Sequence, residues 1–251
     1  MQDLAMDLHV HTVLSACAEA EMLPPLIVQR ALELGLAAIA VTDHNSAENV
    51  SAVRSAAWGS SLVVLPGMEV QTREEVHLLA IFDEVEQALL LQGAVYASLP
   101  QESNRPEFFG EQWVVSPEGE PLRQNTRLLQ TSTHFSVETA IELVHERGGI
   151  CLAAHVDRPA FSLIANLGFV PAGLALDGVE LSRTCLPARF VSRHQDLAGF
   201  GVTCSGDAHR LQEMTARTHY MVEAASVAEL RLALAQRHGR SVRILEPSGC
   251  A

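Results

Sequence analysis

The stretch Asp7-Leu8-His9-Val10-His11-Thr12 ends a short apolar run that begins at Leu4. Such a run is typical of a buried strand, and side chains two residues apart on a strand point to the same side of the sheet. His9 and His11 are therefore expected to extend together from the end of this strand. Two imidazoles placed in this way can bind one divalent metal ion.

The same pattern, an apolar run followed by histidine with an acid nearby, recurs along the chain. The further histidines of this kind are His44, His77, His155 and His209. The acids close to them in sequence or on a neighbouring run are Asp43, Glu69, Glu75, Asp157 and Asp207. Imidazole and carboxylate groups delivered from the ends of successive strands are what a site for several divalent ions requires. The pattern therefore predicts a multinuclear metal site.

Apolar runs alternate with amphipathic segments over most of the chain. The expected strands are 4–10, 37–42, 62–69, 76–82, 150–154, 178–181, 202–205 and 218–222. The expected helices are 24–35, 46–58, 84–91, 136–147, 161–167, 188–198 and 226–238, with Ser46 and Ser136 as N-caps. This alternation favours a parallel sheet that is buried on both faces, although 62–69 and 76–82 are close enough to form a hairpin. Since polar residues follow nearly every strand at its carboxyl end, we expect an α/β fold of the distorted βα-barrel type.

Residues 84–133 interrupt the alternation. After the helix at 84–91, residues 93–133 are rich in Pro, Gly, Gln and Asn, with two short strands expected around a Pro-Glu-Gly turn at 117–119. A long excursion of this kind is typical of a functional lid or cap. We therefore expect a single domain over 1–251 with an inserted cap at about 84–133. Trp113 and Phe108-Phe109 either stack a nucleobase or form a small core beneath the cap, and the small core is the preferred interpretation.

Composition narrows the classes of function. The chain has 251 residues, 48% of them hydrophobic, and a net charge of −13. All 17 basic residues are arginine, which excludes Schiff-base chemistry and the lysine of a phosphate-binding P-loop. The five cysteines, at 17, 151, 185, 204 and 250, have no regular spacing, which indicates a reducing compartment and thus a cytoplasmic location. We expect neither a signal peptide nor a transmembrane helix, and therefore no membrane partner.

Five motifs, taken in order, resemble those of the PHP (polymerase and histidinol phosphatase) superfamily. They are His-x-His at 9–11, Thr-Asp-His-Asn at 42–45, Pro-Gly-x-Glu at 66–69, the strand-end His155, and Gly-Asp-x-His at 206–209. The resemblance covers most of the chain but says little about 84–133. It implies a distorted seven-stranded βα barrel, up to three divalent ions, and hydrolysis of phosphoesters.

The resemblance also implies three clusters of metal ligands. The first comprises His9, His11, Glu69 and Asp207. Glu69 bridges to the second, which adds His77 and His155. The third takes His44, His209 and one residue from the loop after His11. Asp7 and Asp43 are expected to orient ligand histidines from behind.

The last ligand of the third cluster is where the chain departs from the family pattern. The family often has Ser-Asp in this loop, whereas the present chain reads Ser15-Ala16-Cys17-Ala18-Glu19. Counting back from His44 selects Glu19, and counting forward from His11 selects Cys17. Glu19 is the preferred candidate. A thiolate would favour zinc, whereas carboxylate and imidazole also suit manganese or iron, so the identity of the two or three ions stays open.

Candidates for substrate binding follow the strands as well. Arg158 and Arg183 are the first candidates to bind a phosphate by two hydrogen bonds, and Arg210 is the next candidate. The alternative for each is a surface arginine paired with a nearby acid. His134, where the insertion rejoins the barrel, either reaches the substrate as an acid or merely precedes the helix cap. The remaining histidines are interpreted as structural or solvated: His145, His194, His219 and His238.

The expected reaction is attack on phosphorus by a metal-activated hydroxide, with Asp207 essential and His209 or His155 as proton donor. A small phosphorylated substrate, possibly a nucleotide, is the first expectation. The alternatives are a 5′-to-3′ exonuclease on short RNA or DNA ends, an amidohydrolase-type enzyme acting on C–N bonds, and a non-catalytic metal-binding module. The amidohydrolase alternative is weakened because its usual carboxylated lysine cannot exist here. The oligomeric state is not predicted.

Overall fold

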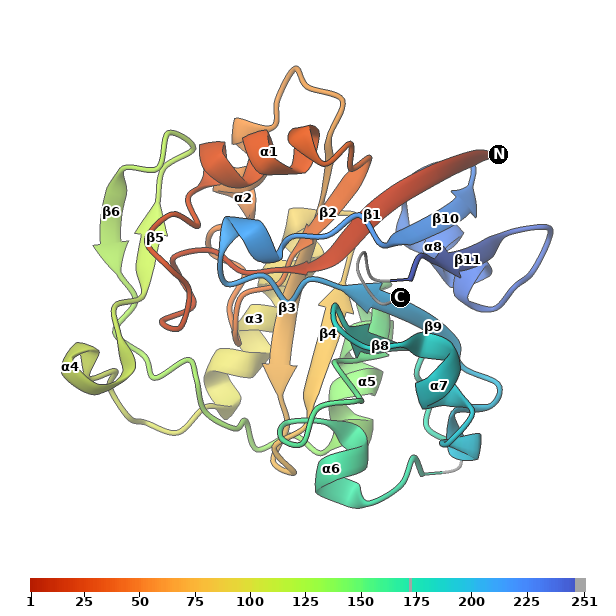
Figure 1. The fold of residues 1–251 in the computed structure, drawn as a ribbon. Helices are drawn as coiled ribbons and strands as arrows, with labels where there is room; N and C mark the ends of the chain where they lie inside the picture. Colours follow the sequence, from red (N-terminus) through yellow and green to blue (C-terminus); the bar gives the residue numbers. More distant parts are fainter. Residues whose placement is uncertain (172, 247–251) are drawn as a thin grey trace.

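Nine strands form one sheet that curls until its ends almost meet (Figure 1). Their order is β11-β10-β1-β2-β3-β4-β7-β8-β9. This computed structural model describes residues 1–171 and 173–246, so Cys250 lies outside the described residues. The strands are β1 (Gln2–Val10), β2 (Ala38–Val41), β3 (Val63–Gln71), β4 (His77–Ile81), β7 (Ile150–Ala153), β8 (Gly178–Ser182), β9 (Gly201–Ser205), β10 (Thr218–Val222) and β11 (Ser241–Ile244). The expected barrel-like α/β fold is confirmed, with nine strands in the sheet where the resemblance implied seven.

The strand directions are mixed, so the expectation of a parallel sheet holds only in part. The pairs β1·β2, β2·β3, β7·β8 and β8·β9 are parallel. The pairs β3·β4, β4·β7, β1·β10 and β10·β11 are antiparallel. The short connection between β3 and β4 makes the hairpin that the sequence indicated, because a tight turn can join only antiparallel strands.

The segment after β9 lies against the end of β1. The backbone N–H of His11 donates to the Ala208 carbonyl at 3.0 Å, and the N–H of Ala208 donates to the His9 carbonyl at 3.1 Å. Val10 and Ala208 form a parallel bridge. Residues about 200 positions apart are thereby held side by side at one end of the barrel.

Helices pack around the outside of the sheet (Figure 1). They are α1 (Pro24–Glu33), α2 (Val50–Ala56), α3 (Val85–Ser98), α4 (Pro106–Phe109), α5 (Val137–Glu146), α6 (Leu163–Leu167), α7 (Pro187–Val191) and α8 (Val227–Leu234), with 3-10 turns at Gln195–Leu197 and Leu211–Glu213. The larger buried cluster includes side chains of α1, α2, α3 and α5, and the smaller one joins α8 to β1, β4 and β7. Within the described residues, no helix is both long and apolar enough to cross a bilayer.

Several helix boundaries differ from the sequence prediction. Ser136 caps α5 as expected, and Ser226, which the sequence analysis did not single out, caps α8. Ser46 does not cap α2, because its hydroxyl bonds the Tyr96 hydroxyl at 2.7 Å and the helix starts only at Val50. The helix expected at 84–91 continues to Ser98, and the predicted helix at 188–198 is divided into α7 and a 3-10 turn.

The remainder of the insertion carries a separate hairpin of β5 (Trp113–Val115) and β6 (Pro121–Gln124), visible at the left of Figure 1. Two asparagines that follow β2 attach the insertion to the barrel. Asn45 Nδ2 donates to the carbonyls of Leu129 and Thr131 at 2.7 and 2.8 Å. Asn49 Nδ2 donates to the Trp113 carbonyl, and its Oδ1 accepts from the Val115 N–H. The insertion is therefore bonded directly to the loop that carries His44.

Gly67 of β3 is packed closely between β2 and β4. A Cβ atom there would lie 2.8 Å from the Ala80 carbonyl oxygen and 2.8 Å from Thr42 Cγ2. We predict that Gly67→Ala lowers the free energy of unfolding by about 1–3 kcal/mol, because a methyl group overpacks the junction of β2, β3 and β4. Gly93→Ala is the matched control: this exposed helical glycine has no atom within 4 Å of the added Cβ, so stability should rise by about 0.5–1 kcal/mol. Urea denaturation measures both, and equal values for the two variants would contradict the analysis.

Candidate metal centre

The ends of β1 and β3 and the segment after β9 bring together the first predicted ligand group. One ligand atom from each of its members lies within 4.8 Å of the others: His9, His11, Glu69 and Asp207. His11 Nε2 is 3.0 Å from Asp207 Oδ1, and His9 Nε2 is 3.3 Å from Glu69 Oε1. All four side chains are at most 3% exposed. The structure thus joins residues that span 198 positions of the chain.

Glu69 connects this group to a second one. Its Oε1 lies 2.8 Å from His77 Nδ1 and 3.1 Å from His155 Nε2. Its Oε2 lies 2.8 Å from His44 Nδ1. Each oxygen of a carboxylate can serve a different ion, so this position suits a bridging ligand.

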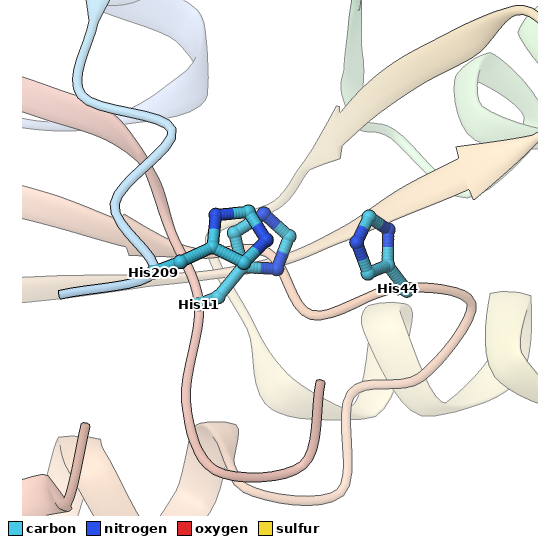
Figure 2. A group of neighbouring side chains, drawn as sticks. All are labelled: His11, His44 and His209. Atoms are coloured by element: carbon cyan, nitrogen blue, oxygen red, sulfur yellow. The ribbon is translucent and has the colours of Figure 1, made fainter. Parts of the chain in front are cut away.

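The third group consists of His11, His44 and His209 (Figure 2). The rings of His11 and His209 stack with centroids 4.1 Å apart, and the ring of His44 lies 4.6 Å from that of His11. Figure 2 shows the three imidazoles converging from separate segments. They come from the end of β1, the loop after β2 and the segment after β9.

The structure does not bring the Glu19 carboxylate into this third group. It pairs instead with Arg210 at 3.1 Å, and both side chains are more than half exposed. The Cys17 thiol, the other candidate, makes side-chain hydrogen bonds with His209 and His44. Although desolvation raises its pKa, these two histidines lower the pKa of Cys17 to about 6.

Some buried polar atoms of these residues have no hydrogen-bond partner, as expected for atoms that bind a cation. Among the described residues, His77 Nε2 and His155 Nδ1 are buried and make no hydrogen bond. Leaving such atoms unsatisfied is costly, and buried carboxylates are normally paired or coordinated to metal. Clustered oxygen and nitrogen donors of this kind match divalent transition metals.

Electrostatics keep the two central carboxylates ionised. Burial raises the pKa of Glu69, but the charges of His77, His9 and His44 outweigh it and hold the pKa well below its usual value. Asp207 behaves similarly, because His9 and His11 overcome the effect of burial on its pKa. The pKa values of the histidines shift in different directions. Burial lowers the pKa of His11 and His77, whereas nearby carboxylates, against burial, raise the pKa of His9 and His44. The carboxylates therefore stay negatively charged among the imidazoles, which is the form of a carboxylate that binds a cation.

A buried acid that sequence reasoning missed supports His9. His9 Nδ1 lies 3.0 Å from Glu180 Oε2, and Glu180 is fully buried on β8. Because a carboxylate can only accept, this contact places a proton on Nδ1 and turns Nε2 toward Glu69 and Asp207. The available signal was an acid inside the apolar run 178–181, which is rarely tolerated without a partner.

Asp43 and Asp7 support the site in different ways. Asp43 accepts from the Ser15 hydroxyl at 2.7 Å, and the same hydroxyl lies 2.9 Å from His11 Nδ1. Asp7 instead accepts from backbone N–H groups, including that of Gly206 at 2.9 Å. Burial raises the pKa of Asp7 to about 7, partly offset by these backbone donors. Asp43 thus acts on an imidazole through Ser15, whereas Asp7 fixes the backbone before Asp207.

A pocket of about 600 Å³ opens over the ligand groups. Its lining includes Arg158, whose Nη1 lies 2.5 Å from Asp207 Oδ2. Arg183 lies in an adjoining hollow, which Arg158 also lines, and pairs with Glu213 at 3.0 Å. His134 is exposed, and its backbone N–H donates to the Ser98 hydroxyl; the pocket lining does not include it.

The other histidines and the insertion aromatics lie apart from this pocket. His145 pairs with Asp177 at 2.8 Å, and His219 pairs with Asp3 at 3.2 Å. Trp113 lines a separate, mainly apolar hollow with residues of the loop after β1. Phe108 lies on α4 under the guanidinium of Arg105. None of these side chains belongs to the lining of the metal-site pocket.

Comparison with known proteins identifies a family and several relatives that resemble this chain. The PHP domain family matches residues 7–167. The 5′-3′ exoribonuclease Rnm of Salmonella typhimurium is 31% identical over 80 residues, covering 30% of this chain and 26% of that protein. Rnm of Escherichia coli is 22% identical over 195 residues, covering 61% and 65%. The lesion-specific endonuclease PfuEndoQ from Pyrococcus furiosus superposes with a TM-score of 0.68 at 19% identity, over 96% of this chain and 58% of that one.

This chain therefore spans less than two thirds of the length of each of these relatives. The family match covers more than half of the chain and includes seven of the nine predicted ligands. Asp207 and His209 follow it in sequence but join the same cluster in space. The chain belongs to the PHP domain family.

Proposed function

We propose that this protein is a metal-dependent phosphoesterase that acts on a nucleotide phosphate, either of a free nucleotide or at the end of a short RNA or DNA strand. The observation that carries the proposal is the continuous set of donors around Glu69, open to a pocket that holds Arg158. The relatives named as an exoribonuclease and a lesion-specific endonuclease support a nucleic-acid substrate. A free small phosphorylated metabolite is the second candidate, since the net charge of −13 disfavours a long polyanion.

We place two or three divalent ions in the three ligand groups. Glu69 would bridge the group of His9, His11 and Asp207 to that of His77 and His155. When bound, such ions polarise phosphoryl oxygens and lower the pKa of a bound water. Manganese, zinc and iron all suit these ligands.

Arg158 is the residue we assign to the substrate phosphate. Its guanidinium forms an ion pair with Asp207, and this contact positions it at the edge of the ligand cluster. A planar guanidinium can donate two parallel hydrogen bonds to phosphate. Arg183 in the adjoining hollow would take a second role, on a more distant part of the substrate. We assign the protonation of the leaving oxygen to His209 or His155, and His134 is kept only as a more distant candidate.

We also propose that the chain is one domain, in which the inserted segment at about 84–133 acts as a fixed cap. Support comes from Asn45, which bonds the carbonyls of Leu129 and Thr131, and from Gln71, whose Nε2 donates to Ser132 Oγ at 3.1 Å. Residues 130–132 line the pocket directly.

Replacement of Asp207 by Asn should abolish hydrolysis, with kcat reduced by a factor of about 10³ or more, because a charged metal ligand is lost from the most buried group. The variant should keep its circular dichroism spectrum. The assay is release of phosphate or nucleotide from mononucleotides, nucleoside bisphosphates and short oligonucleotides with added manganese. Retention of wild-type activity would refute the assignment.

Ionic strength separates the two substrate classes. Binding of a single strand should weaken steeply as salt rises, whereas binding of a mononucleotide should change little.

The third ligand group can be tested by metal content. We predict that Cys17→Ser lowers the metal content or the affinity for the weakest ion by about 10-fold or more, because the thiol contacts His44 and His209. Glu19→Gln is the matched control and should leave metal content unchanged, since its carboxylate lies on Arg210. Elemental analysis after dialysis measures both variants. The reverse outcome would restore Glu19 as the ligand.

A further inference from the structure

The pocket over the metal centre has an aromatic wall that the reaction described above does not use. Phe161 lines the same pocket as Arg158, Asp207 and His155, in the loop between β7 and α6. Its ring stacks on the imidazole of His77, with centroids 4.9 Å apart and planes at 23°. The side chain is 44% exposed. A large apolar ring is thus held partly open beside the cluster of ligands.

The backbone at Phe161 is strained in a way that fixes the position of the ring. Its φ is +55°, a conformation that bulky side chains rarely adopt, and such strain persists only where the surroundings impose it. The Phe161 carbonyl accepts from the backbone N–H of His77 at 3.0 Å. Next to it, the Ser162 hydroxyl donates to the Arg158 carbonyl at 2.7 Å and accepts from the Ala165 N–H to cap α6. The ring and the Arg158 guanidinium therefore belong to one closed loop.

Polar groups of the insertion form another part of the pocket wall. Gln130, Thr131 and Ser132 line it. Amide and hydroxyl groups of this kind offer both donors and acceptors. The bonds from Asn45 and Gln71 hold this segment in place. The volume of about 600 Å³ falls within the range of small-ligand sites, and an aromatic surface with a few polar groups suits a flat heterocycle.

We propose that Phe161 is a stacking platform for the nucleobase of the nucleotide whose phosphate binds at Arg158 and the metal centre. This inference rests on the proposed function and names the part of the substrate that the protein recognises. Every base has a π-face, so stacking favours nucleotides over phosphoesters without a base and tolerates different bases. Donors and acceptors of residues 130–132 then contact the edge of the stacked base.

An exposed phenylalanine outside the site serves as a control. Phe108 is 71% exposed but lies on α4 in contact with Arg105, outside the pocket lining. Phe108→Leu removes the same type of ring without changing the pocket. Phe161→Leu keeps an apolar side chain against His77 while removing the π-surface, and Phe161→Trp restores an aromatic face.

The test compares adenosine 5′-monophosphate with ribose 5-phosphate, which lacks the base, on the manganese-loaded protein. Calorimetry gives the Kd of each, and KM and kcat are measured where hydrolysis occurs. The proposal predicts that Phe161→Leu weakens binding of the nucleotide by about 5-fold or more and leaves ribose 5-phosphate unchanged. Phe161→Trp should restore nucleotide binding, and Phe108→Leu should change neither ligand.

Two results would overturn the proposal. An equal loss for both ligands would mean that the ring only supports His77. No loss for either would place the base elsewhere. The ratio of the two Kd values is measured independently of catalysis. A protein that binds the nucleotide through Phe161 but hydrolyses no phosphoester would refute the proposed function and leave the base site intact.

Discussion

The buried carboxylate of Glu69 is the group on which the rest of the site depends. It is 1% exposed and has imidazole nitrogens of His44, His77 and His155 within 3.1 Å, with His9 at 3.3 Å. An ionised carboxylate in this position is costly unless positive charge surrounds it. The surrounding imidazoles offset this cost, because they hold the pKa of Glu69 well below its usual value. The same geometry suits divalent cations, because each carboxylate oxygen faces imidazole nitrogens of its own.

The barrel supplies this geometry through its mixed strand directions. Glu69 lies on β3 and His77 starts β4, so the antiparallel hairpin places Gln71 opposite His77 and brings the imidazole back to the carboxylate. The bridge between Val10 and Ala208 does the same for Asp207 and the first strand. Glu180 and Asp43 then orient His9 and His11 from behind. Arg158 and Phe161 share one loop after β7, so the expected phosphate contact and the aromatic wall have a common anchor.

Much of this arrangement could be predicted from the sequence, because metal-ligand types stood at the ends of apolar runs. His9, His11, Glu69 and Asp207 were grouped correctly in space, although their roles as ligands remain predictions. The loop after His11 could not be resolved by counting, since its length differs from the family pattern and only its folded path shows Cys17 turned to His44 and His209. Glu180 was missed because it sits inside a strand instead of at its end. Gly93 ended the predicted helix too early: Leu91 and Val95 on either side of it are buried, and their packing overrides the low helix propensity of the glycine.

Anomalous X-ray diffraction from crystals of the manganese-loaded protein tests the central claim most directly. The account predicts at least two adjacent anomalous peaks that share the Glu69 carboxylate, one toward His9, His11 and Asp207 and the other toward His77 and His155. A single peak without Glu69 as a ligand, or ions bound only outside this cluster, would contradict it.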